Sequence, residues 1–170
     1  MEAKVKRIGI GQTLIAYLET LLLGLWLGSM IFFSFVVAPR AFAVLPSRHL
    51  AGQLVSSSLS ALEIIGLVLG PILIVLRLIN GVRGSSFAKI LHLSLLALMT
   101  MCAGVSRMIL APKLESLRSA MGGVIDTVSA NDPLRLQFDD LHKYSVAMMT
   151  IAMLAGLIAL LLSVRSWLNR

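Results

Sequence analysis

The sequence predicts an all-α integral membrane protein, a single domain built as a four-transmembrane-helix bundle. Of its 170 residues, 58% are hydrophobic and only 14% are charged, too little charge to cover the surface of a soluble domain of this length. Several apolar stretches exceed the ~20 residues that a helix needs to cross a hydrocarbon core of about 30 Å. Helices are expected because lipid cannot satisfy free backbone groups, and no stretch alternates as barrel strands do.

The first helix is predicted over residues 9–38 and is expected to stop at Pro39. Its basic start resembles a signal peptide, but the apolar stretch is too long for one, so we expect the segment to be retained. Small side chains recur every four residues along it, at Ala16, Thr20, Gly24 and Gly28. Such a stripe lets helix backbones approach closely, either within the bundle, in a homo-oligomer or against another membrane protein.

The second and third helices are predicted over residues 47–79 and 86–111. Ser47 is the expected N-cap of the second helix, and Asn80-Gly81 is expected to close it. The turn to the third helix is very short, which predicts antiparallel neighbours. The second helix also carries a stripe of small and polar side chains, made of Ser56, Ser60, Glu63, Gly66 and Gly70.

The fourth helix is predicted over residues 133–164, with Asp132 as N-cap and Pro133 at its first position. A long connection precedes it, and its first half, PKLESLRSAM, keeps helical spacing up to a break at Gly122-Gly123. We therefore expect the third and fourth helices to extend beyond the membrane on the outer side.

The distribution of charge predicts a bacterial inner-membrane protein with both termini in the cytoplasm. One side of the predicted bundle has many basic residues and a single acid, Glu2. On the other side the long loop contains acids as well as basic residues, so no concentrated positive charge remains there. The basic residues of the first side are Lys4, Lys6, Arg7, Arg77, Arg83, Lys89, Arg165 and Arg170. Topology thus accounts for the net charge of +7, and nucleic-acid binding, which calls for a clustered basic patch, is not predicted.

Two carboxylates lie inside apolar helices: Glu19 in AYLETLLLGLWLGSM and Glu63 in SSSLSALEIIGLVLG. An isolated charge in hydrocarbon costs several kcal/mol, so both should face the bundle interior. At about 1.5 Å per residue, Glu19 and His92 fall at a similar depth and are expected to pair or hydrogen-bond. Glu63 has no cation at its level, and we expect it to be protonated or to bind a cation or a proton. The alternative for both is a neutral carboxyl that hydrogen-bonds Ser or Thr.

A second polar cluster is expected at the outer helix ends, from Arg40, Arg107, His142 and Asp139. Salt bridges within it would hold the loops. Alternatively, the cluster would form a vestibule for a solute or an ion.

No catalytic constellation is apparent, and no cofactor is predicted; copper and haem are the alternatives. Soft ligands for copper fall at similar depth at Met99, Cys102, Met149 and Met153, although methionine is also a common filler of helix interfaces. His92 and His142 should lie near opposite faces, roughly 20 Å apart in depth, and cannot clamp one haem.

Three stretches carry a family resemblance: WLGSMIFFSFVVAPRAFAVLP followed by AG, then SRMILAPKLESLR, then FDDLHKYS. Together they resemble a bacterial family of unknown function related to eukaryotic transmembrane protein 205, which implies a four-helix membrane protein. The matching positions include Trp26, Gly28, Pro39, Phe42, Pro112, Phe138 and Ser145. More remotely, the chain is similar to copper-resistance D-like membrane proteins and to a membrane haem-pathway oxidase family.

The leading hypothesis is a non-enzymatic membrane protein that handles an ion or small solute through its polar interior, with Glu63 and Glu19 as acid sites. Two further hypotheses are a haem- or copper-associated redox component and an assembly partner within a membrane complex.

Overall fold

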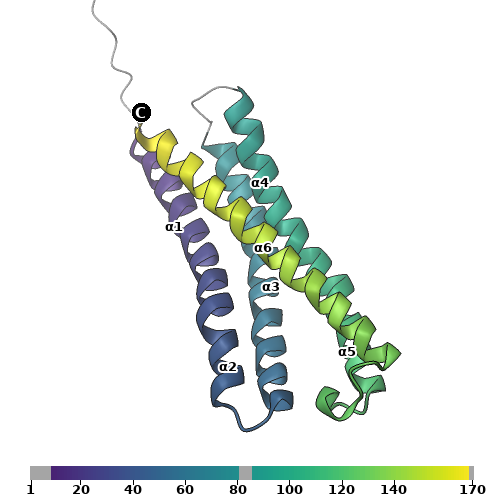
Figure 1. Ribbon diagram of the computed structural model, residues 1–170. Coiled ribbons are helices and arrows are strands. Elements are labelled where there is room, and N and C mark those ends of the chain that lie inside the picture. The colour runs from purple at the N-terminus through teal and green to yellow at the C-terminus, as the bar shows by residue number, and fades with distance from the viewer. Residues whose placement is uncertain (1–8, 81–85, 169–170) are drawn as a thin grey trace, which may run out of the picture.

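The computed structural model describes residues 9–80 and 86–168, and every element in these ranges is helical. Four rods make up the molecule (Figure 1). The first consists of α1 (Ile10–Phe32), a π-helical turn η1 (Phe33–Val37) and α2 (Ala38–Val44), and the second is α3 (Arg48–Ile79). The third combines α4 (Ser86–Val105), the π-helical turn η2 (Ser106–Leu110) and α5 (Ala111–Ala120). A loop with the 3₁₀ turn η3 (Ile125–Thr127) leads to the fourth, α6 (Pro133–Leu168).

All four rods are long and apolar enough to cross a membrane, and the chain is a multi-pass membrane protein. Only 22–28% of each span is buried within the protein. The remaining side chains are mostly large and apolar, Phe35, Ile65 and Leu161 among them, and this exterior is stable only against lipid.

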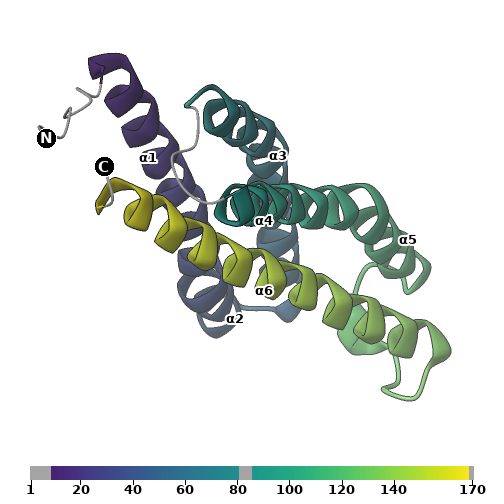
Figure 2. The same cartoon turned by 90° about the horizontal axis from the view of Figure 1, so that it is seen from above.

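The rods pack in a ring in which α1 contacts α3, α3 contacts α4, α4 contacts α6, and α6 returns to α1. Figures 1 and 2 show α6 crossing the bundle obliquely, from beside α1 at one end to beside α5 at the other. The start of α1 and the end of α6 lie at the same end of the bundle (Figure 1). The turn between α2 and α3 lies at the opposite end, where α5 also lies.

The core between the rods is built from large side chains and the glycines that receive them. Trp26, Leu73, Leu96 and Met99 are all at most 2% exposed. A Cβ added at Gly66 would lie 2.7 Å from the Trp26 ring, so the glycine makes room for the indole. Glu63, Gly66 and Gly70 of the α3 stripe are buried, as their spacing predicts, whereas Ser56 is exposed.

Helix ends follow the predicted capping chemistry. The Ser47 hydroxyl accepts from the Leu50 N–H at 3.2 Å, and an Asp132 carboxylate oxygen accepts from the Leu134 N–H at 2.8 Å. Gly122 and Gly123 adopt φ of 75° and 82°, a left-handed conformation that glycine enters without steric cost. The predicted closing residue Gly81 lies outside the described residues, as do Lys4, Lys6, Arg7, Arg83 and Arg170 of the basic side.

Three of the predicted helix limits were too short. The first rod continues through Pro39 to Val44, the third runs to Ala120, and the fourth runs to Leu168. Proline lacks an N–H and its ring clashes with the carbonyl four residues earlier. Each of the two prolines follows a π-helical turn at the same spacing, in which Ala38 N–H bonds Phe33 O and Ala111 N–H bonds Ser106 O. The wider turn moves the backbone groups and lets the rod continue.

Candidate functional site: a cavity that ends at Glu63

Glu63 occupies the buried face of α3, at the predicted place in the stripe of small and polar residues. The residue is 5% exposed. Its Oε1 accepts a hydrogen bond from the Ser106 hydroxyl, whereas Oε2 is buried and has no hydrogen-bond partner among the described residues. One oxygen of the carboxyl is therefore held, and the other is buried without a hydrogen bond in the described part of the chain.

Ser106 is the first residue of the π-helical turn η2. It continues the buried face of α4, on which Leu95, Met99 and Cys102 recur at three- and four-residue spacing, and this spacing aims the hydroxyl at the carboxyl. The π turn changes the direction of the side chains that follow it, and such turns are frequent at functional sites. Pro112, one of the positions of the family resemblance, follows this turn in α5.

A cavity of about 390 Å³ extends from Glu63 toward the end of the bundle that holds α5. Its walls come from α2, α3, η2, α5, η3 and α6, with apolar surface supplied by Phe42, Val55, Leu59, Leu114, Ile125 and Phe138. Polar and charged side chains also line it, namely Arg48, His49, Ser56, Ser106, Glu115, Arg118, Arg135, Asp139, His142 and Ser145. Its volume lies in the range of small-molecule sites.

Arg118 ties the walls of this cavity together. Its guanidinium donates to Glu115 of the same helix and to Ser56 of α3, both at 3.1 Å. It also lies 5.8 Å from the centre of the Phe138 ring of α6, a cation–π distance. One arginine therefore links three helices around the opening.

The remaining charged and aromatic groups of the opening are held locally. Arg135 donates to the Val128 carbonyl at 2.7 Å. The rings of Phe138 and His142 stack, with centroids 6.3 Å apart and planes within 3° of parallel. The Arg135 bond ties the connection between α5 and α6 to the start of α6, whereas the ring stack lies within α6.

A second, much smaller cavity of about 30 Å³ lies next to the first. Leu59, Glu63, Ser106 and Ser145 line both, so they lie where the two spaces meet. Sulfur-bearing side chains surround the rest of the small cavity, and these are Met30, Met99, Cys102, Met148 and Met149.

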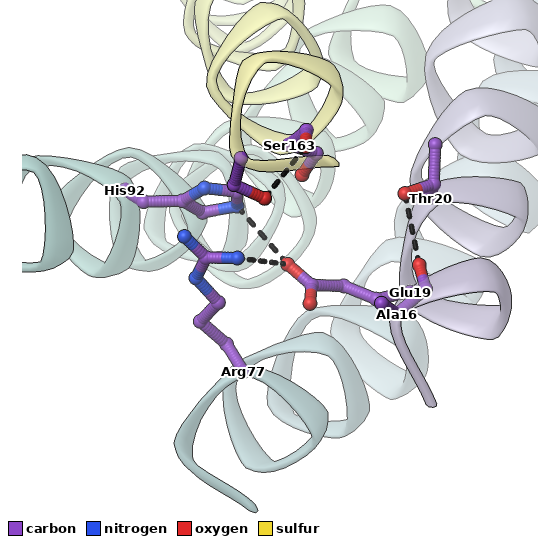
Figure 3. A network of polar contacts seen from close by, with 7 residues as sticks. Ala16, Glu19, Thr20, Arg77, His92 and Ser163 are labelled. Carbon is purple, nitrogen blue, oxygen red and sulfur yellow. Dashed lines mark hydrogen bonds and ion pairs between the residues drawn. The ribbon is translucent and has the colours of Figure 1, made fainter. Parts of the chain in front are cut away.

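A separate polar cluster lies at the opposite end of the bundle and takes one residue from each rod (Figure 3). Glu19 Oε1 lies 3.5 Å from Arg77 Nη1 and 3.4 Å from His92 Nε2. Ser163 of α6 lies beside them and is 2% exposed. We call these four residues the clasp. The contacts of Glu19 with Arg77 and His92 join three rods, and Ser163 brings the fourth rod beside them (Figure 3).

The expected approach of Glu19 and His92 is present, and Arg77 is an additional member. Arg77 is 4% exposed, although its position near a helix end had suggested a cytoplasmic topology charge. Continuing the three- and four-residue spacing of the α3 stripe beyond Gly70 leads to Leu73 and Arg77. That periodicity is the sequence signal that identifies it.

The predicted outer polar cluster is only partly assembled. Asp139 and His142 line the large cavity, whereas Arg40 and Arg107 are outside its lining. Among described residues Arg107 makes no hydrogen bond or ion pair, although its charge acts on Glu63. His142 stacks on Phe138 instead of meeting Arg107. Arg118, Arg135 and Glu115 also line the cavity; they were not predicted, because the sequence of a surface helix gives no signal of which cavity the helix borders.

The positions of the family resemblance fall in several places. Phe42, Phe138 and Ser145 line the large cavity, and Trp26 lines the small one. Pro39 and Pro112 follow the two π turns. A Cβ at Gly28 would meet no atom within 4 Å, so this glycine faces away from the rest of the chain.

Together, the spans and the enclosed polar sites define an integral membrane protein with a cavity that leads to a buried acid. The model of a domain of unknown function, DUF4149, matches residues 21–122. This is more than half of the 170 residues, and the chain belongs to that family. The match includes Glu63, Ser106, Arg77 and His92, while α6 lies beyond it. No curated protein and no solved structure matches the chain.

Proposed function

We propose that this protein binds an ion or small solute in the large cavity and uses Glu63 as the acid that receives it. The observation that carries the proposal is the Glu63 carboxyl, which borders the cavity with Oε2 unpartnered in the described part of the chain. A buried carboxylate oxygen that accepts no hydrogen bond is costly, and intramembrane acids commonly mark ion or substrate pathways.

Movement across the membrane would require the rods to rearrange. Beyond Glu63 the interior is apolar, with Leu23, Leu27, Leu73 and Leu96 in the core, and the clasp joins the rods at the far end. In this proposal the cavity is the entrance and the clasp closes the exit. Both termini are placed in the cytoplasm of a bacterial inner membrane because basic residues concentrate at their end, so the cavity would open outward.

The test is flux or binding in proteoliposomes that contain the wild type or Glu63→Gln. The amide is nearly isosteric with a protonated carboxyl, and the substitution should preserve folding. We expect it to abolish the pH or cation dependence of uptake, measured with internal pH- and ion-sensitive dyes. Asp140→Asn removes a carboxylate outside the cavity and serves as the matched control. Equal uptake by wild type and Glu63→Gln would overturn the proposal.

A copper-associated role is the second candidate, and the small cavity supports it. Met99, Cys102 and Met149 of the predicted soft-ligand set line that cavity, while Met153 does not. Thioether and thiolate sulfur suit Cu(I). Metal analysis of the purified protein tests this: stoichiometric copper that is lost in Cys102→Ala and retained in Met153→Leu would replace the first candidate.

The two histidines support no shared haem. His92 belongs to the clasp and His142 lines the cavity at the other end. We also propose that the chain is related to transmembrane protein 205. In support, Phe42, Phe138 and Ser145 of the resemblance line the cavity, and Pro39 and Pro112 follow the two π turns.

A further inference from the structure

We propose that the ligand of the large cavity is an organic ammonium ion: a molecule with an apolar body and one protonated amine that binds Glu63. This inference rests on the proposed function and names the chemical class of its solute.

The inner end of the cavity carries the acceptors that an ammonium group needs. Glu63 Oε2 is unpartnered within the described residues, and the hydroxyl groups of Ser106 and Ser145 border the same junction of the two cavities. An ammonium has three N–H donors and no acceptor. One carboxylate and two hydroxyls can therefore satisfy it while its charge offsets that of Glu63.

A multivalent metal ion fits this set less well. Calcium requires six to eight oxygen ligands and magnesium a near-ideal octahedron. Across residues 9–80 and 86–168, no group of three or more His, Cys, Asp or Glu side chains could hold a metal ion. A single carboxylate with two hydroxyls instead suits a singly charged cation that donates hydrogen bonds.

The walls determine the rest of the ligand. Phe42, Leu59, Leu114 and Phe138 give the cavity apolar surfaces, and a volume of about 390 Å³ is far larger than a bare ion needs. Burying an apolar body there contributes about 25 cal/mol per Å² of surface removed from water. An inorganic ion would leave these surfaces unused.

Among the described residues, two of the three arginines that line the cavity already make hydrogen bonds within the protein. Arg118 donates to Glu115 and Ser56, and Arg135 donates to the Val128 carbonyl. The third, Arg48, begins α3 at the outer end, whereas the unsatisfied acceptor at the inner end is the Glu63 carboxylate.

The experiment compares benzylamine, benzyl alcohol and benzoate, which share one ring and differ in charge. Binding to the full chain in lipid nanodiscs is measured by titration calorimetry, with empty nanodiscs subtracted to remove partition into lipid. We expect benzylamine to bind at least tenfold more tightly than the other two. The preference should disappear in Glu63→Gln and persist in Asp140→Asn.

Each other outcome is informative. Equal binding of benzylamine and benzyl alcohol, unaffected by Glu63→Gln, would overturn the inference, as would a preference for benzoate. Glu63-dependent binding of sodium or protons without benzylamine binding would overturn it too, but would leave the proposed function standing. If no probe, sodium ion or proton shows Glu63-dependent binding, both proposals fail.

Discussion

Glu19 and Glu63 are both buried carboxylates, yet their surroundings assign them different tasks. Glu19 lies within 3.5 Å of a guanidinium and an imidazole. Glu63 has only the Ser106 hydroxyl as a hydrogen-bond partner in the described residues and borders a cavity. A carboxylate beside a buried cation has its charge offset within the protein, whereas a carboxylate with an unsatisfied oxygen has unused capacity to accept hydrogen bonds. We therefore attribute joining of the rods to Glu19 and recognition to Glu63.

The clasp predicts a non-additive effect on stability. Arg77→Met leaves the Glu19 carboxylate without its guanidinium, and removing one member of a buried pair costs about 3–5 kcal/mol. The double substitution Glu19→Gln with Arg77→Met removes both charges and should recover part of that loss. Unfolding in detergent of the wild type, both single variants and the double variant measures the coupling. Additive losses would show that the pair contributes no specific interaction.

The contact between Glu19 and His92 was predicted because it depends only on their depth in the membrane. Glu19 and His92 were expected together because helical rise places them at one level. A bond from Ser or Thr to Glu63 was the alternative expectation, and the structure supplies it from Ser106, which was not among the predicted site residues. The neighbouring Arg107 was predicted as a site residue because it is charged, but it does not line the cavity.

The two π turns, η1 and η2, were not predicted from the sequence. Both precede a proline in an Ala-Pro pair at the same spacing. Without an N–H, and with a ring that clashes with an earlier carbonyl, proline makes a regular helix costly by about 3 kcal/mol. A helix can end there or accommodate the ring in a wider turn. The wider turn is favoured because the segments that continue beyond it pack on other helices, α2 on α3 and α5 on α6.

The turn before Pro112 gives the next prediction. If Pro112→Ala lets η2 relax to a regular helix, removing its extra residue turns the side chains of α5 by about 100° relative to α4. Arg118 of α5 would then leave Ser56 and Phe138. Arg118→Ala should therefore lower the melting temperature in detergent in the wild type and clearly less in the Pro112→Ala background. Pro133→Ala, at the start of α6, is the control background. An equal loss in all three backgrounds would show that the proline does not position Arg118.

Glycines on two stripes predict opposite outcomes. A Cβ at Gly70 would lie 2.0 Å from Thr100 Oγ1, and such overpacking typically costs about 1–3 kcal/mol. At Gly28 an added Cβ meets no atom within 4 Å. Gly70→Ala should therefore lower the melting temperature in detergent, and Gly28→Ala should leave it unchanged or raise it slightly, because alanine favours helix. A marked loss in Gly28→Ala would indicate that another protein or a second copy packs on that face.

For the whole molecule, the even number of spans brings the start of α1 and the end of α6 to one end (Figure 1). The large cavity lies at the other end, with the clasp opposite it. This polarity gives the protein two distinct faces, and the function that we propose depends on which face meets the cytoplasm.

Labelling with a membrane-impermeant maleimide tests this orientation. Ser129 is exposed in the connection before α6, and a cysteine there should react from outside intact cells. The native Cys102 is 5% exposed and should give a low background. Tags at both termini should be inaccessible until the cells are permeabilised. Labelling at the termini but not at position 129 would invert the orientation and make the cavity open to the cytoplasm.

Four features could be predicted from the sequence: the apolar helices, their order along the chain, the inward-facing acids, and the caps at Ser47 and Asp132. These follow from local rules, because apolar length, helical period and capping groups act within a few residues of chain. Tertiary structure alone decided that Arg77 joins the clasp, that Ser106 holds Glu63, and that α2, α3, α5 and α6 enclose a cavity. Each of these depends on how separate helices cross and rotate against one another. That arrangement is set by the packing of side chains distant in sequence, such as Trp26 on Gly66.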